Sequence, residues 1–327
     1  MSQPRILVLS LGGTITMLPS AGAGIAPTLG AAELVACVPA LAQVADIEAK
    51  SLLRVASPSL SAAHLVDVAL AIDKGFASGC DGAVVIQGTD TIEESAFLLD
   101  LLVGSDKPVV VTGAMRGADA PGADGPANLL SAVRVAAAPA SRGLGTLAVL
   151  NDEIHAARFV QKSHTALPSA FLSPLMGAIG TSIEGQPRYY ARLARTPCLS
   201  AAHGPPAPVA LIKAAMGDDG RLLAALPGLG YAGVVLEGMG AGHVPADVAP
   251  LLGALAAQIP VVLASRAMTG PVFTHTYGYP GAEIDLIERG LVPAGYLSGP
   301  KARLLLGLVL RGPGSAARVT AAFAPYQ

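Results

Sequence analysis

Charge is scarce in this chain of 327 residues, and neither sign dominates. Charged residues make up 13% of the sequence, and the formal net charge is -2. No run of lysine and arginine forms the basic stripe with which proteins bind nucleic acids or acidic membranes. We therefore expect neither a nucleic acid nor a membrane as a partner.

Long apolar runs are also missing, although hydrophobic residues reach 52% of the chain. Each apolar run has the length of a strand and is broken by glycine, proline or charge well short of a bilayer span. The first of them begins a few residues after Met1, which leaves no room for the basic and apolar regions of a signal peptide. The sequence thus predicts a soluble, cytoplasmic protein.

Cysteine is too rare for a disulfide framework. Cys37, Cys80 and Cys198 are far apart and lack the spacing of metal ligands. No basic neighbour is evident that would activate one of them as a nucleophile. We expect three reduced, buried thiols and no metal site.

The common nucleotide-binding motifs are absent as well. Gly12-Gly13-Thr14 follows an apolar run, as a phosphate-binding turn would. It is not continued as G-x-G-x-x-G with an acidic residue about 20 positions later, and no G-K-[ST] follows it. The glycines alone predict only a tight turn after a strand, so the threonine is the informative residue.

Strand-like and helical patterns alternate through the first half of the chain, and its length favours two domains. Such alternation predicts right-handed crossovers and a parallel sheet with both faces covered by helices. The expected strands are near 5–11, 44–56, 82–88, 108–113 and 146–151, and the expected helices are near 30–38, 61–78, 91–103 and 125–138.

Residues 191–208 are rich in proline and arginine and cannot form a central strand or a continuous helix. We interpret them as a linker between a catalytic α/β domain at 1–190 and a smaller α/β domain at 209–327. In the second domain, strands are expected at 209–213, 231–236 and 261–265, and helices near 245–258 and 300–310. The predicted fold class is α/β, with a larger, mostly parallel N-terminal sheet covered by helices.

Two threonines follow two of the predicted strands. Thr14 follows Gly12-Gly13, and Thr89 stands in Gly88-Thr89-Asp90. Ligands bind at the carboxyl ends of parallel strands, and the free amides of a following helix favour an anion or a developing oxyanion. If the strands are neighbours, both hydroxyls can face one pocket. The second motif also reads as a helix cap with acidic residues in the first turn.

A threonine acts as a nucleophile only when a base takes its proton and donors stabilise the oxyanion. Lys162 is the candidate base, because a lysine partly desolvated beside Asp90 and Thr89 can exchange a proton with a hydroxyl. The alternative interpretation is that Lys162 is a solvated surface charge.

Several motifs in this order resemble the bacterial-type asparaginase/glutaminase amidohydrolases. They are GGTI at 12–15, GTDTIEES at 88–95, KPVVVTGAMR at 107–116, ADGPANL at 123–129, the segment from NDEI to Lys162, Ser265-Arg266 and the stretch 295–303. The resemblance covers nearly the whole chain. It implies hydrolysis of L-asparagine to L-aspartate and ammonia without a metal or organic cofactor. It also implies a homotetramer built from intimate dimers, with active sites between one subunit's N-terminal domain and its partner's C-terminal domain.

The resemblance also assigns roles to individual residues. It makes Thr14 the first nucleophile and groups Thr89, Asp90 and Lys162 as the second catalytic set. Substrate contacts are implied for Ser57, which would bind the substrate carboxylate, for Asp90, which would bind its ammonium, and for Gly88 and Glu283.

The chain departs from the family pattern at the first loop. Residues 16–28 lack the tyrosine that helps to activate the first threonine. Tyr277 or Tyr279, with Glu283 nearby in sequence, can take that place from a partner subunit, or both can be ordinary turn aromatics.

Substitutions elsewhere concern substrate preference and location. Pro58 and Ala241 replace a glutamine and an asparagine of relatives, which puts the preference for asparagine over glutamine in doubt. Ser105 replaces the disulfide partner of Cys80, as suits a cytoplasmic protein. Three alternatives stay open: a glutaminase, the amidase partner of a tRNA-dependent amidotransferase, and a non-catalytic small-molecule binding module. The second is weakened by the lack of an RNA-binding domain.

Overall fold

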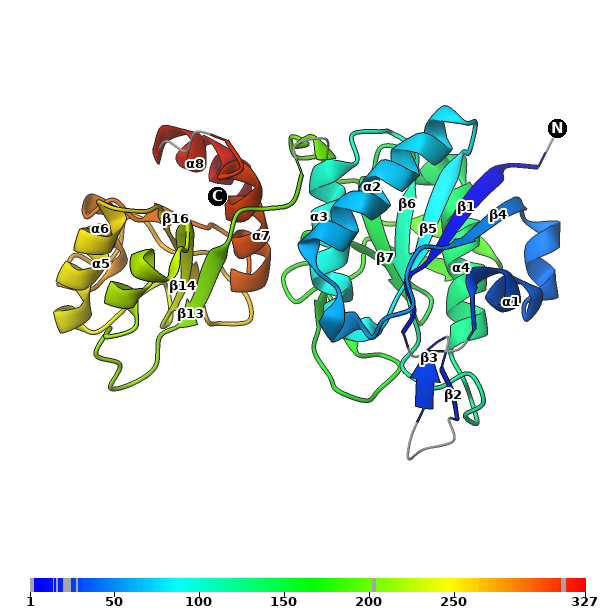
Figure 1. Cartoon of the computed structure of the whole chain (residues 1–327), viewed down its shortest axis with the longest axis horizontal. Helices are drawn as coiled ribbons and strands as arrows, with labels where there is room; N and C mark the ends of the chain where they lie inside the picture. The colour runs from blue at the N-terminus through cyan, green and yellow to red at the C-terminus, as the bar shows by residue number, and fades with distance from the viewer. Residues whose placement is uncertain are drawn as a thin grey trace. The chain divides into compact units, whose positions relative to one another are not determined.

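The computed structural model divides the chain into two compact units, Met1–Ala202 and His203–Gln327, both of α/β construction (Figure 1). The residues that it describes are 3–13, 15, 17–19, 25–27, 29–201, 204–312 and 316–327.

A mostly parallel sheet forms the centre of the first unit. In the described part of the chain its strand order is β12-β11-β8-β7-β6-β5-β1-β4, and the neighbours from β4 to β7 run parallel. This confirms the predicted parallel sheet. The strands are β1 (Arg5–Ser10), β4 (Asp46–Ser51), β5 (Gly82–Ile86), β6 (Val109–Thr112), β7 (Thr146–Leu150), β8 (Glu153–Ala156), β11 (Gly180–Ile183) and β12 (Gln186–Tyr189).

The strands that precede the two threonine motifs, β1 and β5, are direct neighbours. Ser10 is paired with Ile86 in parallel register, and the Leu11 amide donates to the Ile86 carbonyl at 2.8 Å. The two strands therefore end side by side at the same edge of the sheet. This meets the condition under which the sequence predicted a shared pocket.

Helices cover both faces of this sheet, which explains why its central strands read as unbroken apolar runs (Figure 1). Residues such as Ile6, Val84 and Val110 pack with Leu129 of α4 on one face. On the other face, α3 lies against β6 and β7. The helices are α1 (Ala31–Ala36), α2 (Ala62–Ala77), α3 (Ile92–Leu102) and α4 (Gly125–Ala137), close to their predicted positions.

An antiparallel extension of the sheet was not predicted. Asn151 and Asp152, at φ 51° and 60°, turn β7 back into β8. A two-residue hairpin turn needs two such left-handed residues, which asparagine and aspartate tolerate. Glu184 and Gly185 do the same between β11 and β12. Two short ladders outside the sheet join β2 (Met17–Pro19) to β3 (Ile25–Pro27) and β9 (Gln161–Lys162) to β10 (Phe171–Leu172).

The second unit has a smaller parallel sheet in the order β13-β14-β15-β16, with α7 packed against its first three strands. Its core includes Val234, Leu252 and Leu263. The strands are β13 (Val209–Lys213), β14 (Gly233–Gly238), β15 (Val261–Ser265) and β16 (Val292–Pro293), and the helices are α5 (Ala249–Ala256), α6 (Glu283–Glu288), α7 (Gly299–Val309) and α8 (Ala316–Phe323). The predicted second α/β layer is confirmed, although β16, α6 and α8 were not predicted.

The expectation of buried cysteines holds only for Cys80. All three thiols are free, but Cys37 and Cys198 are exposed, because one ends the short helix α1 and the other lies beyond the last strand of the first unit. Arg195 donates to the Cys198 Sγ at 3.3 Å. Loss of water around this sulfur nevertheless raises the pKa of the Cys198 thiol, so its basic neighbour does not activate it, as the sequence predicted.

Among the described helices, none has both the length and the apolar run needed to cross a bilayer.

Candidate active site

The turn after β1 packs backbone against backbone on two other loops. Gly12 and Gly13 have φ of 110° and 94°, a conformation that favours glycine. A Cβ atom at Gly12 would lie 2.5 Å from the Val55 carbonyl oxygen, and one at Gly13 would overlap the backbone nitrogen of Gly88. The two glycines therefore bring together the loops that follow β1, β4 and β5.

Ser57 closes this contact from the loop after β4. It begins the 3-10 turn Ser57–Ser59 and is 3% exposed. Its Oγ accepts a hydrogen bond from the Asp90 amide at 3.2 Å, and a Cβ atom at Gly88 would lie 2.6 Å from that Oγ. The structure thus brings together Ser57, Gly88 and Asp90, the residues expected to hold a substrate.

Thr14 lies outside the described residues. Gly13 before it and Ile15 after it are both described and buried. The structure accordingly fixes where the first threonine motif begins, against Gly88, and gives no geometry for the Thr14 hydroxyl.

A lysine contacts two residues of the second threonine motif. The Lys162 Nζ donates to the Thr89 Oγ1 at 2.9 Å and forms an ion pair with the Asp90 Oδ1 at 2.6 Å. Its side chain is only 16% exposed, whereas that of Asp90 is 58% exposed. Lys162 is therefore not a solvated surface charge. An amine in this position can exchange a proton with the threonine hydroxyl, and the open side of the Asp90 carboxylate can receive a cation.

Lys162 is held in place through its backbone. The short ladder β9–β10 pairs it with Phe171, and its amide donates to the Glu93 Oε2 at 2.7 Å. Glu93 lies in the first turn of α3, two residues after the turn Thr89–Thr91. The sequence suggested only a helix-terminal role for this acid, so its function as an anchor for the lysine was missed.

Two further residues hold the neighbouring strand ends. Asn128 of α4 donates to the Gly113 carbonyl at 3.0 Å and accepts from the Asn151 amide at 2.9 Å, which ties the ends of β6 and β7 together. A Cβ atom at Gly113 would lie 3.4 Å from the Thr89 Cγ2. Asp124 accepts the Met115 amide at 2.9 Å and thereby fixes the loop after β6. Sequence reasoning did not single out either residue.

Glu283 belongs to the second unit, where its side chain is completely buried. Its Oε1 accepts the amides of Thr276 and Tyr277 at 2.9 and 2.7 Å, and its Oε2 lies 3.1 Å from the His243 Nε2. Burial by itself would raise the pKa of this carboxyl, but these hydrogen bonds outweigh burial and hold the pKa below its usual value. Glu283 is thus a carboxylate at neutral pH.

The two candidate activating tyrosines surround His243 in the same unit. Tyr277 and Tyr279 are 42% and 49% exposed, and the Tyr279 hydroxyl lies 2.9 Å from the His243 Nδ1. Since both belong to the second unit, the first unit by itself does not supply them to Thr89 and Lys162. His243 was not identified from the sequence.

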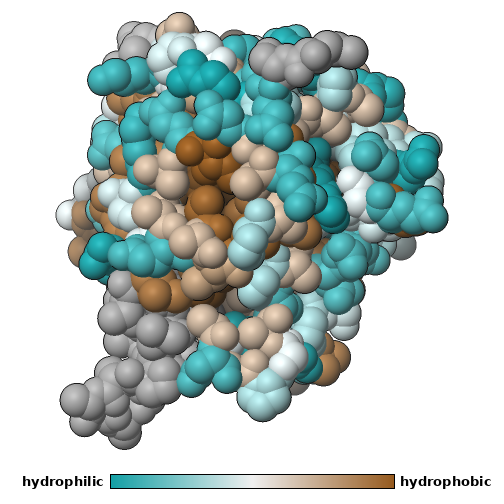
Figure 2. Space-filling view, turned by 90° about the vertical axis from the view of Figure 1, so that its right-hand side faces the viewer, coloured by the Kyte–Doolittle hydropathy of each residue, from teal (hydrophilic) through white to brown (hydrophobic). Residues whose placement is uncertain are grey.

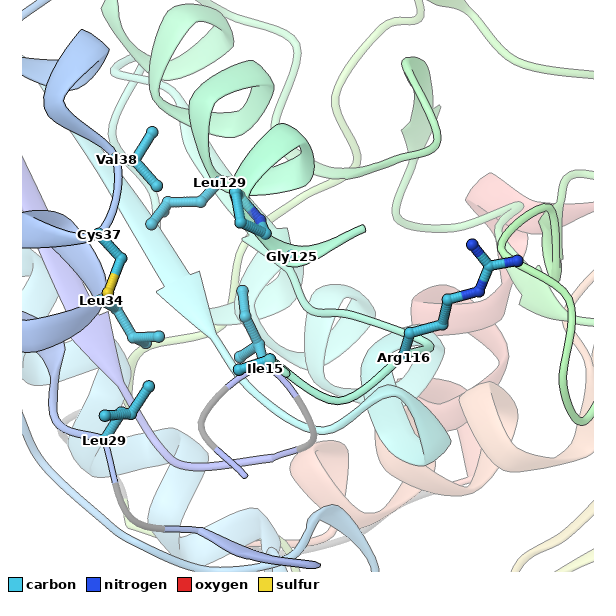
Figure 3. A pocket seen from close by; sticks show the side chains of 10 residues that line it. Ile15, Leu29, Leu34, Cys37, Val38, Arg116, Gly125 and Leu129 are labelled. Carbon is cyan, nitrogen blue, oxygen red and sulfur yellow. The ribbon is translucent and has the colours of Figure 1, made fainter. Parts of the chain in front are cut away.

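A separate small pocket of about 80 Å³ lies beside the first threonine motif. Ile15, Leu34 and Leu129 converge on it, whereas the Arg116 guanidinium points away (Figure 3). The side of the unit that carries α1 also shows a hydrophobic area bordered by hydrophilic side chains (Figure 2). The pocket is thus lined mainly by hydrocarbon, and the polar side chains in its lining are Cys37 and Arg116.

Among the described residues, no group of three histidine, cysteine or acidic side chains is placed to hold a metal ion.

Comparisons with known proteins match both units. The family description "Asparaginase, N-terminal" matches residues 5–195, and "Glutaminase/Asparaginase C-terminal domain" matches residues 208–323. A probable L-asparaginase of Deinococcus radiodurans is 37% identical over 321 residues, covering 94% of this chain and 94% of that protein. A probable periplasmic L-asparaginase of Haemophilus influenzae is 35% identical, covering 94% of this chain and 88% of that protein. The crystal structure of a probable cytoplasmic L-asparaginase from Campylobacter jejuni has a TM-score of 0.89 at 30% identity and covers 98% of this chain and 99% of its own.

Proposed function

This chain belongs to the asparaginase family, and on that premise we propose that it hydrolyses the side-chain amide of L-asparagine to give L-aspartate and ammonia. The observation that carries the proposal is the set Thr89, Lys162 and Asp90, joined at 2.9 and 2.6 Å beside the turn that leads to Thr14. A hydroxyl, an amine and a carboxylate in contact provide the groups that acyl transfer requires.

The proposed reaction proceeds through a threonine ester. The Thr14 hydroxyl attacks the amide carbon, and backbone donors near Thr89 hold the tetrahedral oxyanion. Ammonia leaves as the amide nitrogen takes up a proton, and a water molecule, whose proton Thr89 and Lys162 can accept, then cleaves the ester. The contact between Gly13 and Gly88 supports this assignment, because it places the two threonine motifs side by side.

The substrate is held by its charged amino acid end. We assign the ammonium group to the exposed side of the Asp90 carboxylate, and the substrate carboxylate to the Ser57 hydroxyl. Gly88 leaves the space that the Ser57 side chain occupies, which keeps this hydroxyl beside Asp90. For Glu283, which the resemblance makes a substrate contact, the enclosed carboxylate supports an indirect role.

Assembly, domain limits and location are part of the same proposal. We propose a homotetramer in which each active site combines the first unit of one subunit with the second unit of its partner, and a linker at 191–208 between the domains 1–190 and 209–327. We propose a cytoplasmic location, supported by the cytoplasmic structural relative, although the Haemophilus influenzae relative is named periplasmic. Glutaminase activity is the second candidate, because the C-terminal family description includes glutaminases.

Ammonia release from L-asparagine and L-glutamine tests the proposal. We expect release from asparagine, and a loss of about a thousandfold or more in kcat for both Thr14→Ala and Thr89→Val, because each variant removes a group that takes part in the reaction. The matched control is Thr320→Val at an exposed position of α8, which should leave kcat unchanged. Substantial activity in both Thr14→Ala and Thr89→Val would contradict the mechanism, and faster glutamine turnover would favour the second candidate.

A further inference from the structure

A hydrogen-bonded line of three side chains in the second unit takes no part in the steps above. It runs from the buried Glu283 carboxylate through His243 to the Tyr279 hydroxyl. We propose that His243 is a positioning residue that couples these two groups, so that Tyr279 accepts the proton of the attacking hydroxyl. The inference rests on the proposed function, since it names a residue for the same reaction.

The Glu283 end fixes the tautomer of the histidine. An ionised carboxylate can only accept hydrogen bonds, so the His243 Nε2, 3.1 Å away, must carry the hydrogen. The Nδ1 of the neutral ring then has a free lone pair, and this atom faces the Tyr279 hydroxyl at 2.9 Å. Because Glu283 has no exposed surface, it acts on a ligand only through the histidine.

The imidazole ring is held in one orientation. The backbone of His243 is fixed first, because its amide donates to the Met239 carbonyl at 2.8 Å and its carbonyl accepts from the Met239 amide at 2.7 Å. The ring meets Tyr277 edge to face, with centroids 5.0 Å apart, and Tyr279 at 5.5 Å. Among the described residues, the ionisable side chains that contact the ring are Glu283 and these two tyrosines, and none of them is a cation.

The chemistry of Tyr279 differs from that of its neighbour. Tyr277 stacks on Phe273 with an angle of 2° between the rings. In the described part of the chain, no side chain forms a hydrogen bond with its hydroxyl. Only the Tyr279 hydroxyl ends a line of hydrogen bonds that leads to an ionised carboxylate. Tyr277 therefore provides a matched control at nearly the same exposure.

The proton transfers in this step balance without an added reagent. As the new carbon–oxygen bond forms, the hydroxyl proton moves to the Tyr279 oxygen, and the original phenol proton moves to the His243 Nδ1. The Glu283 carboxylate stabilises the resulting imidazolium. The reverse transfer returns one proton to the amide nitrogen as the carbon–nitrogen bond breaks, and this yields ammonia.

Kinetics of the full-length enzyme test the role of His243. The variant His243→Gln keeps an amide that can bridge Glu283 and Tyr279 but cannot take up a proton. We expect kcat to fall about a hundredfold or more in His243→Gln and in Tyr279→Phe, which is the usual effect of losing a general base, with KM changed by less than about threefold. In both variants any dependence of kcat on protonation of this imidazole should disappear, so their pH profiles should differ from that of the wild type. Tyr277→Phe should keep the wild-type rate and pH profile.

A purely structural histidine gives the opposite result. The glutamine of His243→Gln could replace a histidine that only holds its neighbours in place. A kcat within about twofold of the wild type in that variant or in Tyr279→Phe would therefore overturn the relay. Failure of the relay leaves the loss of activity in Thr89→Val untouched, so it is distinguishable from failure of the proposed function.

A second measurement needs no substrate. NMR of the histidine-labelled protein, with the signal assigned by its absence in His243→Gln, reports the tautomer of the ring. We expect hydrogen on Nε2 at neutral pH and a shift to a mixed tautomer in Glu283→Gln. A neutral ring with hydrogen on Nδ1 in the wild type would overturn the proposal even if the enzyme had no activity on either amide.

Discussion

At the scale of single residues, the site depends on how a lysine is withdrawn from water. The sequence named Lys162 as the candidate base and left open that it is a solvated surface charge. Its 16% exposure and its contacts with Thr89 and Asp90 come from the fold. A sequence pattern can nominate such an amine, but its proton chemistry is set by partners about 70 residues away, which local patterns cannot reveal.

Glu93 should affect turnover although it lies one step away from the reaction. In Glu93→Gln a neutral acceptor replaces the carboxylate that holds the Lys162 amide, and a charged hydrogen bond contributes about 1.5–3 kcal/mol. We expect kcat to fall roughly tenfold, since about 1.4 kcal/mol corresponds to a factor of ten, with the ability to bind substrate retained. Steady-state kinetics with Glu94→Gln as the control measures this. Equal effects of the two substitutions would show that Glu93 has no special role.

Glu283 should make stability sensitive to acid. The pKa of its carboxyl is lower in the folded protein than in the unfolded chain, so its contribution is present above the ordinary carboxyl pKa of about 4.3 and is lost as pH falls through the folded value. The difference in urea midpoint between pH 7 and about pH 3 should therefore be smaller in Glu283→Gln than in the wild type. Glu288→Gln, at an exposed position of the same helix, is the control and should behave like the wild type.

At the scale of elements, the loops after β1, β4 and β5 meet through the backbone of Gly12, Gly13 and Gly88. The apolar runs predicted the strands, and the glycines predicted the turns. The convergence on Ser57 required the parallel register, which the order of the elements implied through the crossover rule. The antiparallel edge was harder to predict, because β12 reads Gln-Pro-Arg-Tyr and offers no apolar alternation. The six-residue helix α6 is likewise too short for a periodic signal.

The contact between Gly13 and Gly88 should not tolerate a methyl group. Gly13→Ala combines the cost of a left-handed backbone, about 1–2 kcal/mol for a residue other than glycine, with overlap on the Gly88 nitrogen. Gly143 has a φ of 74° with no atom within 4 Å of the added carbon, so Gly143→Ala carries the backbone cost alone. We expect Gly13→Ala to lower the urea midpoint more than Gly143→Ala does and to abolish ammonia release. Similar midpoints for the two variants would mean that the loops separate easily.

At the scale of the whole molecule, the candidate residues are divided between two units. Lys162 and Thr89 belong to the first, and His243 and Tyr279 belong to the second. The sequence predicted two α/β domains from composition and alternation alone. The arrangement of subunits is not readable from such patterns, because complementary surfaces are formed by side chains from many separate elements.

Mixing two inactive variants tests the proposed shared site. Lys162→Met damages the first unit and Tyr279→Phe the second, so in a mixed dimer one site carries both changes and the other carries neither. After unfolding and refolding an equal mixture, about a quarter of the wild-type activity should return, as expected for random pairing across a two-fold interface. Each variant refolded alone provides the baseline. No gain above that baseline would place every group of a site in one chain.

The attachment of Lys162 through a ladder of two residue pairs has a consequence for heat tolerance. The proposed proton carrier lies on the ladder of β9 and β10, outside the eight-stranded sheet. Small elements with few pairings open at lower free energy than the body of a protein. Catalysis should then fade on warming while the chain remains folded, and engineering for a hotter process would begin at this ladder rather than in the hydrophobic interior.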